Sequence, residues 1–370
     1  MRIKNYDHII IGGGIQGTAT AFFLSRRGEK VILFEKDKIA QHASGLNAGG
    51  IRTLGRKLEE IPLSILSMEY WNKIEKILGK QSLFFKSNYI KVTKSQNDLK
   101  KAQKRIELLE NSGFYHEICI DKKELKKYVS NISDSYVGGV LVEGNGWAKP
   151  YEVVSGFIEK ALSFGAKVFE NTKVLRCKKV NSNWIVETSS GLFSSPRIIN
   201  CAGAWGAEIA KILGDEFKIK AYAPMLILTN AYPKTLKPIL GILDKTLSLK
   251  QIDTGQFLIG GGAKAKASLK QNSSKLNFRG INEMFDNAKS VIPNLETAKF
   301  QRIWSGIEGY FPDNLPVIGY GSKDGILHAF GFSAHGFQLG PAVGELLADL
   351  SMNRQSRLDI SKLSPSRFVS

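Results

Sequence analysis

The feature that most constrains this chain is a glycine-rich turn near its start, between an apolar run ending at Ile11 and a predicted helix. Its glycines, Gly12, Gly14 and Gly17, follow the spacing G-x-G-x-x-G. The first glycine permits the tight bend, the second lets the backbone approach a pyrophosphate, and the third lets the helix pack on the strand. A second predicted strand ends at Glu35, whose carboxylate can accept hydrogen bonds from a ribose. This order of elements predicts a dinucleotide-binding site rather than a chance glycine-rich turn.

The composition is that of an ordinary globular protein. Of the 370 residues, 43% are hydrophobic and 23% are charged. No apolar run reaches the roughly 18 to 20 residues that span a bilayer, and the first strand starts too early for a signal peptide to precede it. We therefore expect a cytoplasmic protein without a membrane span.

The net charge of +18 raises the question of a nucleic-acid partner. The basic residues are scattered over what we expect to be surface helices, without interleaved aromatic residues or a known binding motif. This pattern favours a solvated, lysine-rich surface and no nucleic-acid partner. A field that attracts anionic substrates, or an acidic protein partner, remains the alternative.

The cysteines limit the metal chemistry that this chain can support. Cys119, Cys177 and Cys201 are far apart and form no C-x-x-C pair. Residues of this chain alone therefore cannot supply a cysteine-ligated iron–sulfur cluster or a multi-cysteine zinc site. We predict reduced thiols and no metal site.

The order of predicted elements indicates an interleaved α/β chain. Short strands that run into glycine turns recur near residues 12, 203 and 336, whereas residues from about 221 to 262 alternate and are strand-rich. The predicted fold class is α/β, with α+β character: a Rossmann-type nucleotide domain built from separated segments, and a second domain with an antiparallel sheet.

Several further segments give the chain a resemblance to a known family. They are the loop 43–52 and residues 199–205, 304–313, 316–319 and 331–338. With the glycine turn and Glu35, these segments resemble the FAD-dependent D-amino-acid oxidase superfamily, which contains glycine oxidase, sarcosine oxidases and dimethylglycine dehydrogenases. Within it, the Asn-Ala-Gly-Gly loop and the Gly-Ile-Glu-Gly segment are most similar to the β-subunit type of sarcosine oxidase and to opine and hydroxyproline dehydrogenases.

The resemblance implies a division into two domains. Residues 1–84, 145–217 and 300–370 would form the FAD-binding domain. Residues 85–144 and 218–299 would form a substrate domain, or cap, whose antiparallel sheet covers the isoalloxazine.

The resemblance also implies where FAD is bound. The glycine turn and the start of the next helix would hold the pyrophosphate, the acidic end of the second strand the ribose, a strand backbone the adenine, and small residues the flavin edge. The last helix would direct its N-terminal amides at the pyrimidine end of the flavin. The candidate residues are Gly12, Gly14, Ile15, Gln16, Gly17, Glu35, Lys36, Ser44, Asn47, Ala48, Gly49, Gly50, Val174, Ala202, Gly203, Trp205, Gly306, Gly336, Phe337, Gln338 and Leu339.

We expect this FAD to be bound without a covalent link. Some relatives attach the flavin to a His in the loop after the first nucleotide unit, where this chain has Asn47. Other relatives use a Cys just before the Pro-Asp segment, and no Cys follows Cys201 here.

Five residues are candidates for the chemistry beside the flavin: Arg52, Glu308, Tyr310, His335 and Gln338. Arg52, or Arg56 in its place, would bind a substrate carboxylate; a surface or phosphate-binding role is the alternative for Arg52. Glu308 stands where many relatives carry a carboxylate-binding Arg and would favour an amine, unless it forms a structural salt bridge.

The remaining three candidates have simpler alternatives. Tyr310 would cap the pocket or belong to the core, and His335 would act as a base or fix the backbone. Gln338 follows His-Gly-Phe, where monomeric sarcosine oxidases carry a Lys, and its neutrality favours electron transfer to a carrier over rapid reaction with oxygen.

The resulting hypothesis is an FAD-dependent oxidoreductase of a small secondary amine or amino acid, sarcosine-like, that produces an imine for hydrolysis. Alternatives within the fold are a glycine or D-amino-acid oxidase or dehydrogenase and a 2-hydroxy-acid dehydrogenase. Outside it, a nicotinamide-dependent dehydrogenase and a flavoprotein subunit that needs partner chains remain open. The electron acceptor would be oxygen or a carrier, and a hetero-oligomer with other subunits is a possible arrangement.

Overall fold

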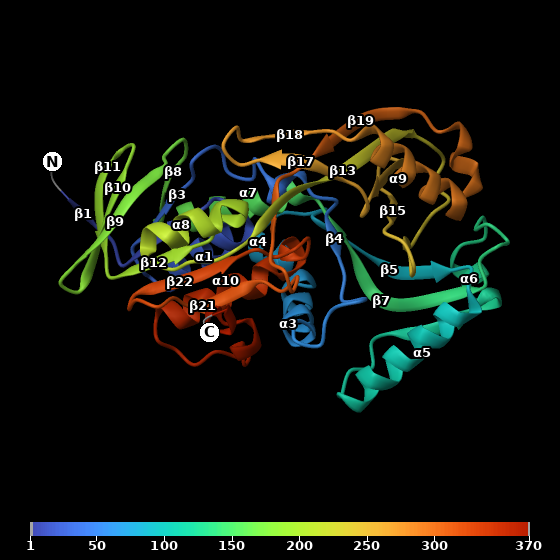
Figure 1. Ribbon diagram of the computed structural model, residues 1–370, viewed down its shortest axis with the longest axis horizontal. Helices are drawn as coiled ribbons and strands as arrows, with labels where there is room; N and C mark the ends of the chain where they lie inside the picture. Colours follow the sequence, from blue (N-terminus) through green and yellow to red (C-terminus); the bar gives the residue numbers. More distant parts are fainter. Residues whose placement is uncertain (1–2, 369–370) are drawn as a thin grey trace.

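The computed structural model describes residues 3–368. At its centre is a six-stranded sheet whose order is β21-β22-β12-β2-β3-β8 (Figure 1). Its strands are β2 (His8–Ile11), β3 (Val31–Phe34), β8 (Lys167–Phe169), β12 (Arg197–Asn200), β21 (Val317–Tyr320) and β22 (Ile326–Phe330). All neighbours pair in parallel except β21 and β22. Strands β2, β3 and β22 are buried along their whole length, and most of their residues are apolar, as is typical of a parallel sheet covered on both faces.

A layer of helices covers one face of this sheet. Helix α1 (Ile15–Arg26) packs between α7 (Pro150–Ser163) and α10 (Gly336–Ser351), and α3 (Ile61–Trp71) packs on α10. Helix α10 begins at Gly336 and continues through Pro341.

A larger, mainly antiparallel sheet extends away from the nucleotide fold. Its order is β18-β17-β13-β16-β15-β14-β5-β7-β4, with β19 and β20 on β13 and β6 on β7. Its strands are β4 (Gly50–Ile51), β5 (Phe84–Thr93), β6 (Ile118–Asp121), β7 (Gly138–Ala148), β13 (Lys220–Ala231), β14 (Ile239–Ile242), β15 (Ser248–Gln251), β16 (Gln256–Gly260), β17 (Lys264–Ser268), β18 (Ser273–Lys275), β19 (Phe300–Ser305) and β20 (Glu308–Tyr310). Three helices accompany it: α5 (Gln96–Asn111), α6 (Lys122–Tyr128) and α9 (Phe278–Val291).

The remaining elements are short. A four-stranded sheet at the left of Figure 1 joins β1 (Lys4–Asn5) to β11 (Gly191–Ser195), β10 (Asn183–Thr188) and β9 (Val174–Val180). The other helices are α2 (Ala43–Leu46), α4 (Ile74–Leu78) and α8 (Gly206–Leu213). The 3₁₀ segments are Gly203–Trp205, Pro293–Thr297, Ser361–Leu363 and Pro365–Phe368.

This architecture confirms the predicted fold class, a parallel nucleotide-binding sheet with a separate antiparallel sheet. The predicted boundaries of the two domains differ from the boundaries of the two sheets. Strands β4, β19 and β20 belong to the large sheet, although the sequence analysis assigned their residues to the FAD-binding segments. Among residues 3–368, no helix is both long and apolar enough to cross a bilayer.

Helices α1 and α10 lie unusually close together because glycines face the contact. A methyl group at Gly344 would lie 2.5 Å from Cβ of Ala19, and one at Gly340 would overlap Ile15. Since these contacts advance in the same direction along both helices, α1 and α10 run parallel. Nε2 of Gln16 donates a 2.8 Å hydrogen bond to the carbonyl of Gly336, so the two N-termini are adjacent.

This contact yields a test of the packing. At an ordinary helix position, Gly→Ala stabilises a protein by roughly 0.5–1 kcal/mol. We expect Gly344→Ala instead to lower the free energy of unfolding by about 1–3 kcal/mol, because the methyl group meets the backbone of Ala19 as well as its side chain. Denaturant unfolding measures the difference, and a variant as stable as wild type or more stable would refute the close packing.

Candidate active site

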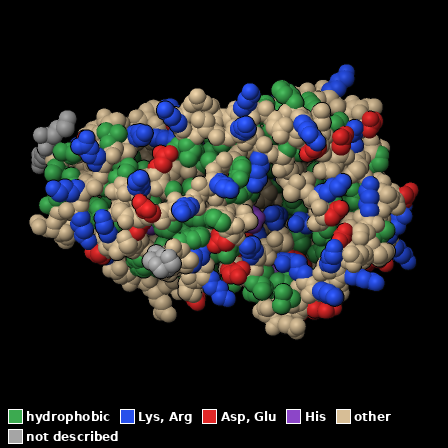
Figure 2. Space-filling view, viewed as in Figure 1, with side chains coloured by type: hydrophobic (Ala, Val, Ile, Leu, Met, Phe, Trp, Pro, Cys, Tyr) green, Lys and Arg blue, Asp and Glu red, His purple; other side chains and the backbone are tan. Residues whose placement is uncertain are grey.

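A cavity of about 970 Å³ opens between the two large sheets. The segments that follow the carboxyl ends of β2, β3, β12 and β22 line this cavity, and open α/β sheets bind ligands at such ends. Figure 2 shows a hollow on this face of the molecule with Lys and Arg side chains at its rim.

The glycine turn forms the floor at one end. Gly12 has a φ of 112°, and any side chain there would overlap the carbonyl of Cys201, the residue that follows β12. Glu35 at the end of β3 lines the same space, and its carboxylate accepts hydrogen bonds from the backbone N–H of Gly13 at 2.6 Å and of Asp37 at 2.8 Å. Its position beside the turn is the one that the sequence pattern predicts.

Beyond Glu35, a polar cluster joins the cavity to the tip of the β17–β18 hairpin. Nζ of Lys36 lies 3.9 Å from the ring centroid of Trp205 and donates to Oδ1 of Asn272 at 2.8 Å. Asp37 accepts hydrogen bonds from Lys36 and Asn272 and pairs with His42. Burial alone would raise the pKa of Asp37, but these partners lower it to about 2.

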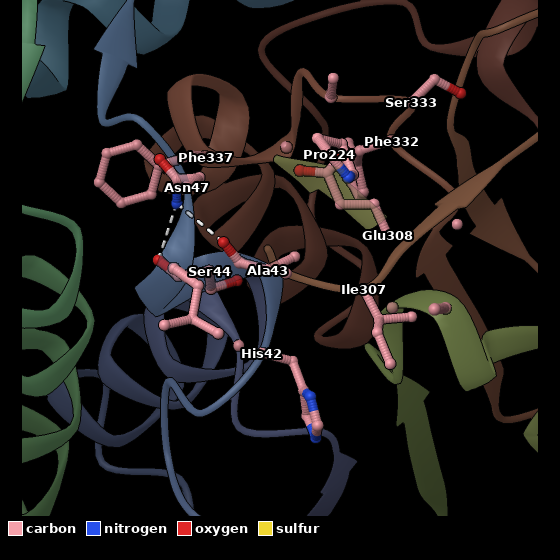
Figure 3. A pocket seen from close by; sticks show the side chains of 18 of the residues that line it. His42, Ala43, Ser44, Asn47, Pro224, Ile307, Glu308, Phe332, Ser333 and Phe337 are labelled. Carbon is pink, nitrogen blue, oxygen red and sulfur yellow. Dashed lines mark hydrogen bonds between the residues drawn. The ribbon is translucent and has the colours of Figure 1, made fainter. Parts of the chain in front are cut away.

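The loop after α2 is held by Asn47. Its Nδ2 donates to the carbonyls of Ala43 and Ser44 at 3.0 and 2.9 Å (Figure 3). Its Oδ1 accepts from the N–H of Gly49 at 2.6 Å. The polar atoms of Asn47 therefore shape the loop. Ser44 also accepts a 3.0 Å hydrogen bond from the N–H of Ile15 at the start of α1.

Gln338 anchors the start of α10. Its Oε1 accepts from Arg56 at 3.1 Å and from Ser64 at 3.0 Å, while its Nε2 donates to the carbonyl of Ser64 at 2.9 Å. The side chain is buried, and these contacts use both ends of its amide. Gln338 itself is neutral, and the positively charged group beside it is the guanidinium of Arg56.

A chain of hydrogen-bonded groups that ends at the buried Glu60 orients Arg52. Nδ1 of His335 lies 2.8 Å from the carboxylate of Glu60, and its Nε2 lies 3.5 Å from a guanidinium nitrogen of Arg52. Burial and the nearby Arg56 lower the pKa of His335 to about 4, so its ring is neutral at pH 7. These contacts assign the proton to Nδ1, which donates to Glu60, while Nε2 accepts from Arg52.

On another wall, β20 presents a carboxylate. Figure 3 shows Glu308 beside Phe332, across the cavity from Asn47 and Phe337. The hydroxyl of Tyr310 donates to Glu308 at 2.8 Å, and Nζ of Lys264 lies 4.0 Å from the Tyr310 ring centroid. Burial raises the pKa of Glu308 to about 7, against the opposing effects of Tyr310 and Lys264.

Most of the predicted residues line this one cavity. The exceptions among the cofactor candidates are Ile15, Gly17, Gly49 and Leu339, and among the catalytic candidates Tyr310 and His335. Gly17 and Gly49 make close backbone contacts instead, with Gly12 and Ala148 respectively. Tyr310 and His335 each contact a residue that does line the cavity.

Two lysines at this site were missed by the sequence analysis. Lys91 on β5 lines the cavity, and Lys250 on β15 is almost fully buried, with its Nζ donating to the carbonyl of Ala48. Burial lowers the pKa of Lys250 to about 7, and within the described residues no carboxylate pairs with it. A lysine in an alternating strand gives no sequence sign of burial.

The metal prediction concerns side-chain clusters. Within residues 3–368, His, Cys, Asp and Glu form no group of three that could hold a metal ion.

Comparison with known proteins identifies the family. A family model described as FAD dependent oxidoreductase (DAO) matches residues 7–350. The chain belongs to this family. It is an FAD-dependent oxidoreductase, as the resemblance predicted, and the nicotinamide-dependent alternative is excluded. The narrower likeness to β-subunit sarcosine oxidases stays a prediction.

Individual relatives match nearly the whole chain. Glycine oxidase of Geobacillus kaustophilus (strain HTA426) is 21% identical, with 98% of this chain and 97% of that protein covered. Its crystal structure superposes with a TM-score of 0.91 and covers 99% of this chain and 100% of the other. Subunit HcnC of hydrogen cyanide synthase from Pseudomonas protegens is 26% identical, covering 99% and 97%. L-proline dehydrogenase from P. horikoshii superposes with a TM-score of 0.92 at 26% identity, covering 100% and 99%.

The residues present fit FAD. The cavity is at the upper end of the usual ligand-site volumes, as a dinucleotide and a substrate together require. The adjacent N-termini of α1 and α10 favour anionic groups. Gly12 has no side chain, so the backbone of the glycine turn remains open to such a group.

Lys250 provides a pH-dependent test of the site. Its folded-state pKa of about 7 lies below the usual value near 10.4, so between these pH values Lys250 binds more protons in the unfolded chain than in the folded one. The contribution of Lys250 to the stability of the folded apoprotein therefore rises with pH. We expect Lys250→Met to be more stable than wild type near pH 7, by about 1–4 kcal/mol. This advantage should shrink toward pH 10, where the neutral amine still bonds to Ala48.

Denaturant unfolding of both apoproteins from pH 6.5 to about pH 10 measures the effect. Lys86→Met, on an exposed lysine of β5, is the matched control and should show no such trend. A stability difference between Lys250→Met and wild type that stays constant with pH would contradict the buried, unpaired ammonium.

Proposed function

We propose that this enzyme oxidises the C–N bond of a small secondary amine or amino acid, sarcosine-like, to an imine that water then hydrolyses. One observation carries the proposal. Arg52, a guanidinium with no carboxylate partner among the described residues, and Glu308, a carboxylate with a pKa near 7, line the same cavity.

FAD would be held by the residues that surround this cavity. The Gly12–Gly14 turn and Ser44 would hold the pyrophosphate, Glu35 the ribose and Val174 the adenine. Ala48, Gly50 and Gly306 would lie along the flavin edge, and the start of α10 at its pyrimidine end. When bound, FAD supplies the acceptor for a hydride equivalent from the carbon beside the amine.

Arg52 would bind the carboxylate of the substrate. Its Nη1 donates to the carbonyl of Leu54 and its Nη2 to His335, so the side chain is held in place before a ligand arrives. Glu60 fixes His335 in turn. His335 is therefore a positioning residue in this proposal, and a neutral one.

Glu308 would take the proton of the substrate ammonium group. Oxidation needs a neutral amine, because its lone pair must assist departure of the hydride. A carboxylate whose pKa is near 7 can accept this proton at neutral pH and hold it away from the reacting carbon. Tyr310, which donates to the same carboxylate, positions it.

Relatives support the choice of substrate class. Glycine oxidase and L-proline dehydrogenase are named for amino-acid substrates. Mitochondrial dimethylglycine dehydrogenase of Rattus norvegicus is 24% identical over 98% of this chain and 45% of that protein. A glycine or D-amino-acid substrate is the alternative, since glycine oxidases match equally well along the chain. A 2-hydroxy acid would leave Glu308 without an ammonium group to bind.

We also propose an electron acceptor and an assembly for this enzyme. Oxygen or a carrier would reoxidise the flavin. HcnC is named as a subunit, which supports a hetero-oligomer for this chain as well. We propose a cytoplasmic location.

The role of Glu308 predicts a pH profile. The anaerobic rate of flavin reduction by N-methylglycine should rise with pH through about 7, because only the carboxylate form accepts the proton. Glu308→Gln should lower the rate about 100-fold and abolish this inflection. Tyr310→Phe, the matched control, should keep the inflection and move it to higher pH, since Tyr310 lowers the pKa of Glu308. Stopped-flow absorbance measures all three, and an unchanged profile in Glu308→Gln would exclude the role.

The attachment of FAD has a simple test. After acid precipitation of the holoenzyme, the yellow colour should stay in the supernatant, because Asn47 stands at the expected His attachment site and no Cys follows Cys201. Absorbance of the two fractions decides, and a yellow pellet would show a covalent link.

A further inference from the structure

The end of the cavity beside Arg52 carries more positive than negative charge. Arg52, Arg56 and Lys91 all line it. Two buried carboxylates lie behind them. Glu60 lies against Arg56 at 3.4 Å and His335 at 2.8 Å, and is the only carboxylate that these cations contact within the described residues.

The second carboxylate serves another cation. Glu117 accepts two hydrogen bonds from Arg105, both at 2.9 Å, and one from the N–H of Gly55 at 2.7 Å. His335 is neutral and does not count. The four cations at this end of the cavity, Arg52, Arg56, Lys91 and Arg105, therefore face two carboxylates, Glu60 and Glu117. Two positive charges, on Arg52 and Lys91, therefore lack a counter-charge.

These two cations are neighbours. A methyl group at Gly55 would lie 3.1 Å from Nζ of Lys91 and 3.9 Å from Nη1 of Arg52. Lys91 makes no ion pair within the described residues, and burial, followed by repulsion from Arg52, lowers its pKa to about 8. Partly buried cations without partners are costly, so the pair is suited to an anionic ligand.

We propose that the substrate is a dicarboxylic amino or imino acid, with one carboxylate bound by Arg52 and the second by Lys91. The proposal rests on the proposed function and specifies its substrate class. A single carboxylate would leave one of the two cations uncompensated. Glu308, on another wall, remains for the amine. Lys91 is then a specificity-determining residue.

Two small molecules differ in the proposed feature alone. Iminodiacetate is N-methylglycine with a carboxylate added to its methyl group. We expect anaerobic flavin reduction in the holoenzyme to be about 10- to 100-fold more efficient with iminodiacetate, as the ratio of limiting rate to dissociation constant. Lys91→Met should lose this preference, so that its efficiencies with the two molecules lie within about threefold of each other. Lys86→Met, an exposed lysine on the same strand, should behave as wild type.

A binding measurement separates this inference from the proposed function. Malonate and acetate perturb the absorbance of oxidised flavin when they bind beside it, and neither can be oxidised. Malonate should bind the wild-type holoenzyme at least about 10-fold more tightly than acetate, and Lys91→Met should bind both alike.

Each outcome has a definite meaning. If malonate is preferred but no amine reduces the flavin, the proposed function fails and the dianion site stands. If N-methylglycine and iminodiacetate react equally well and malonate has no advantage over acetate, Lys91 shares one carboxylate with Arg52 and the inference is wrong. Lys91→Arg, which keeps the charge, should retain the preference, and its loss there would also count against the inference.

Discussion

Two parallel helices, α1 and α10, place their N-termini side by side, and the rest of the site depends on this contact. Glycines at 340 and 344 let the helix backbones approach, and Gln16 ties one N-terminus to the other. Adjacent positive helix ends repel each other unless an anion lies between or before them. A pyrophosphate at one end and a reduced flavin at the other would satisfy this requirement, so that the packing of the scaffold would favour the binding of FAD.

Two walls of the cavity carry side chains of opposite charge. Arg52 and Lys91 come from the loop before Gly55 and from β5, whereas Glu308 comes from β20 at another part of the large sheet. An amino acid has the complementary polarity. Burial tunes both walls, since it raises the pKa of Glu308 and lowers that of Lys91.

Much of the fold follows from local pattern, and the limits of prediction are equally physical. The glycine turn and Glu35 were predictable because their spacing requires a particular backbone. Gln338 and His335 were candidates for the chemistry beside the flavin, and their polar atoms bond to the scaffold or to Arg52. The residue type alone does not reveal which partner a side chain takes. The sequence analysis did not single out Lys91 or Lys250, because burial of a lysine depends on which strands of a distant segment lie beside it.

The most direct test of the account compares the affinity of the apoprotein for FAD with that for riboflavin, by quenching of flavin fluorescence. Riboflavin keeps the isoalloxazine but lacks the pyrophosphate and adenosine that the helix ends and Glu35 would hold. The account predicts that FAD binds at least about 100-fold more tightly. Equal affinities, or no quenching by FAD, would contradict it.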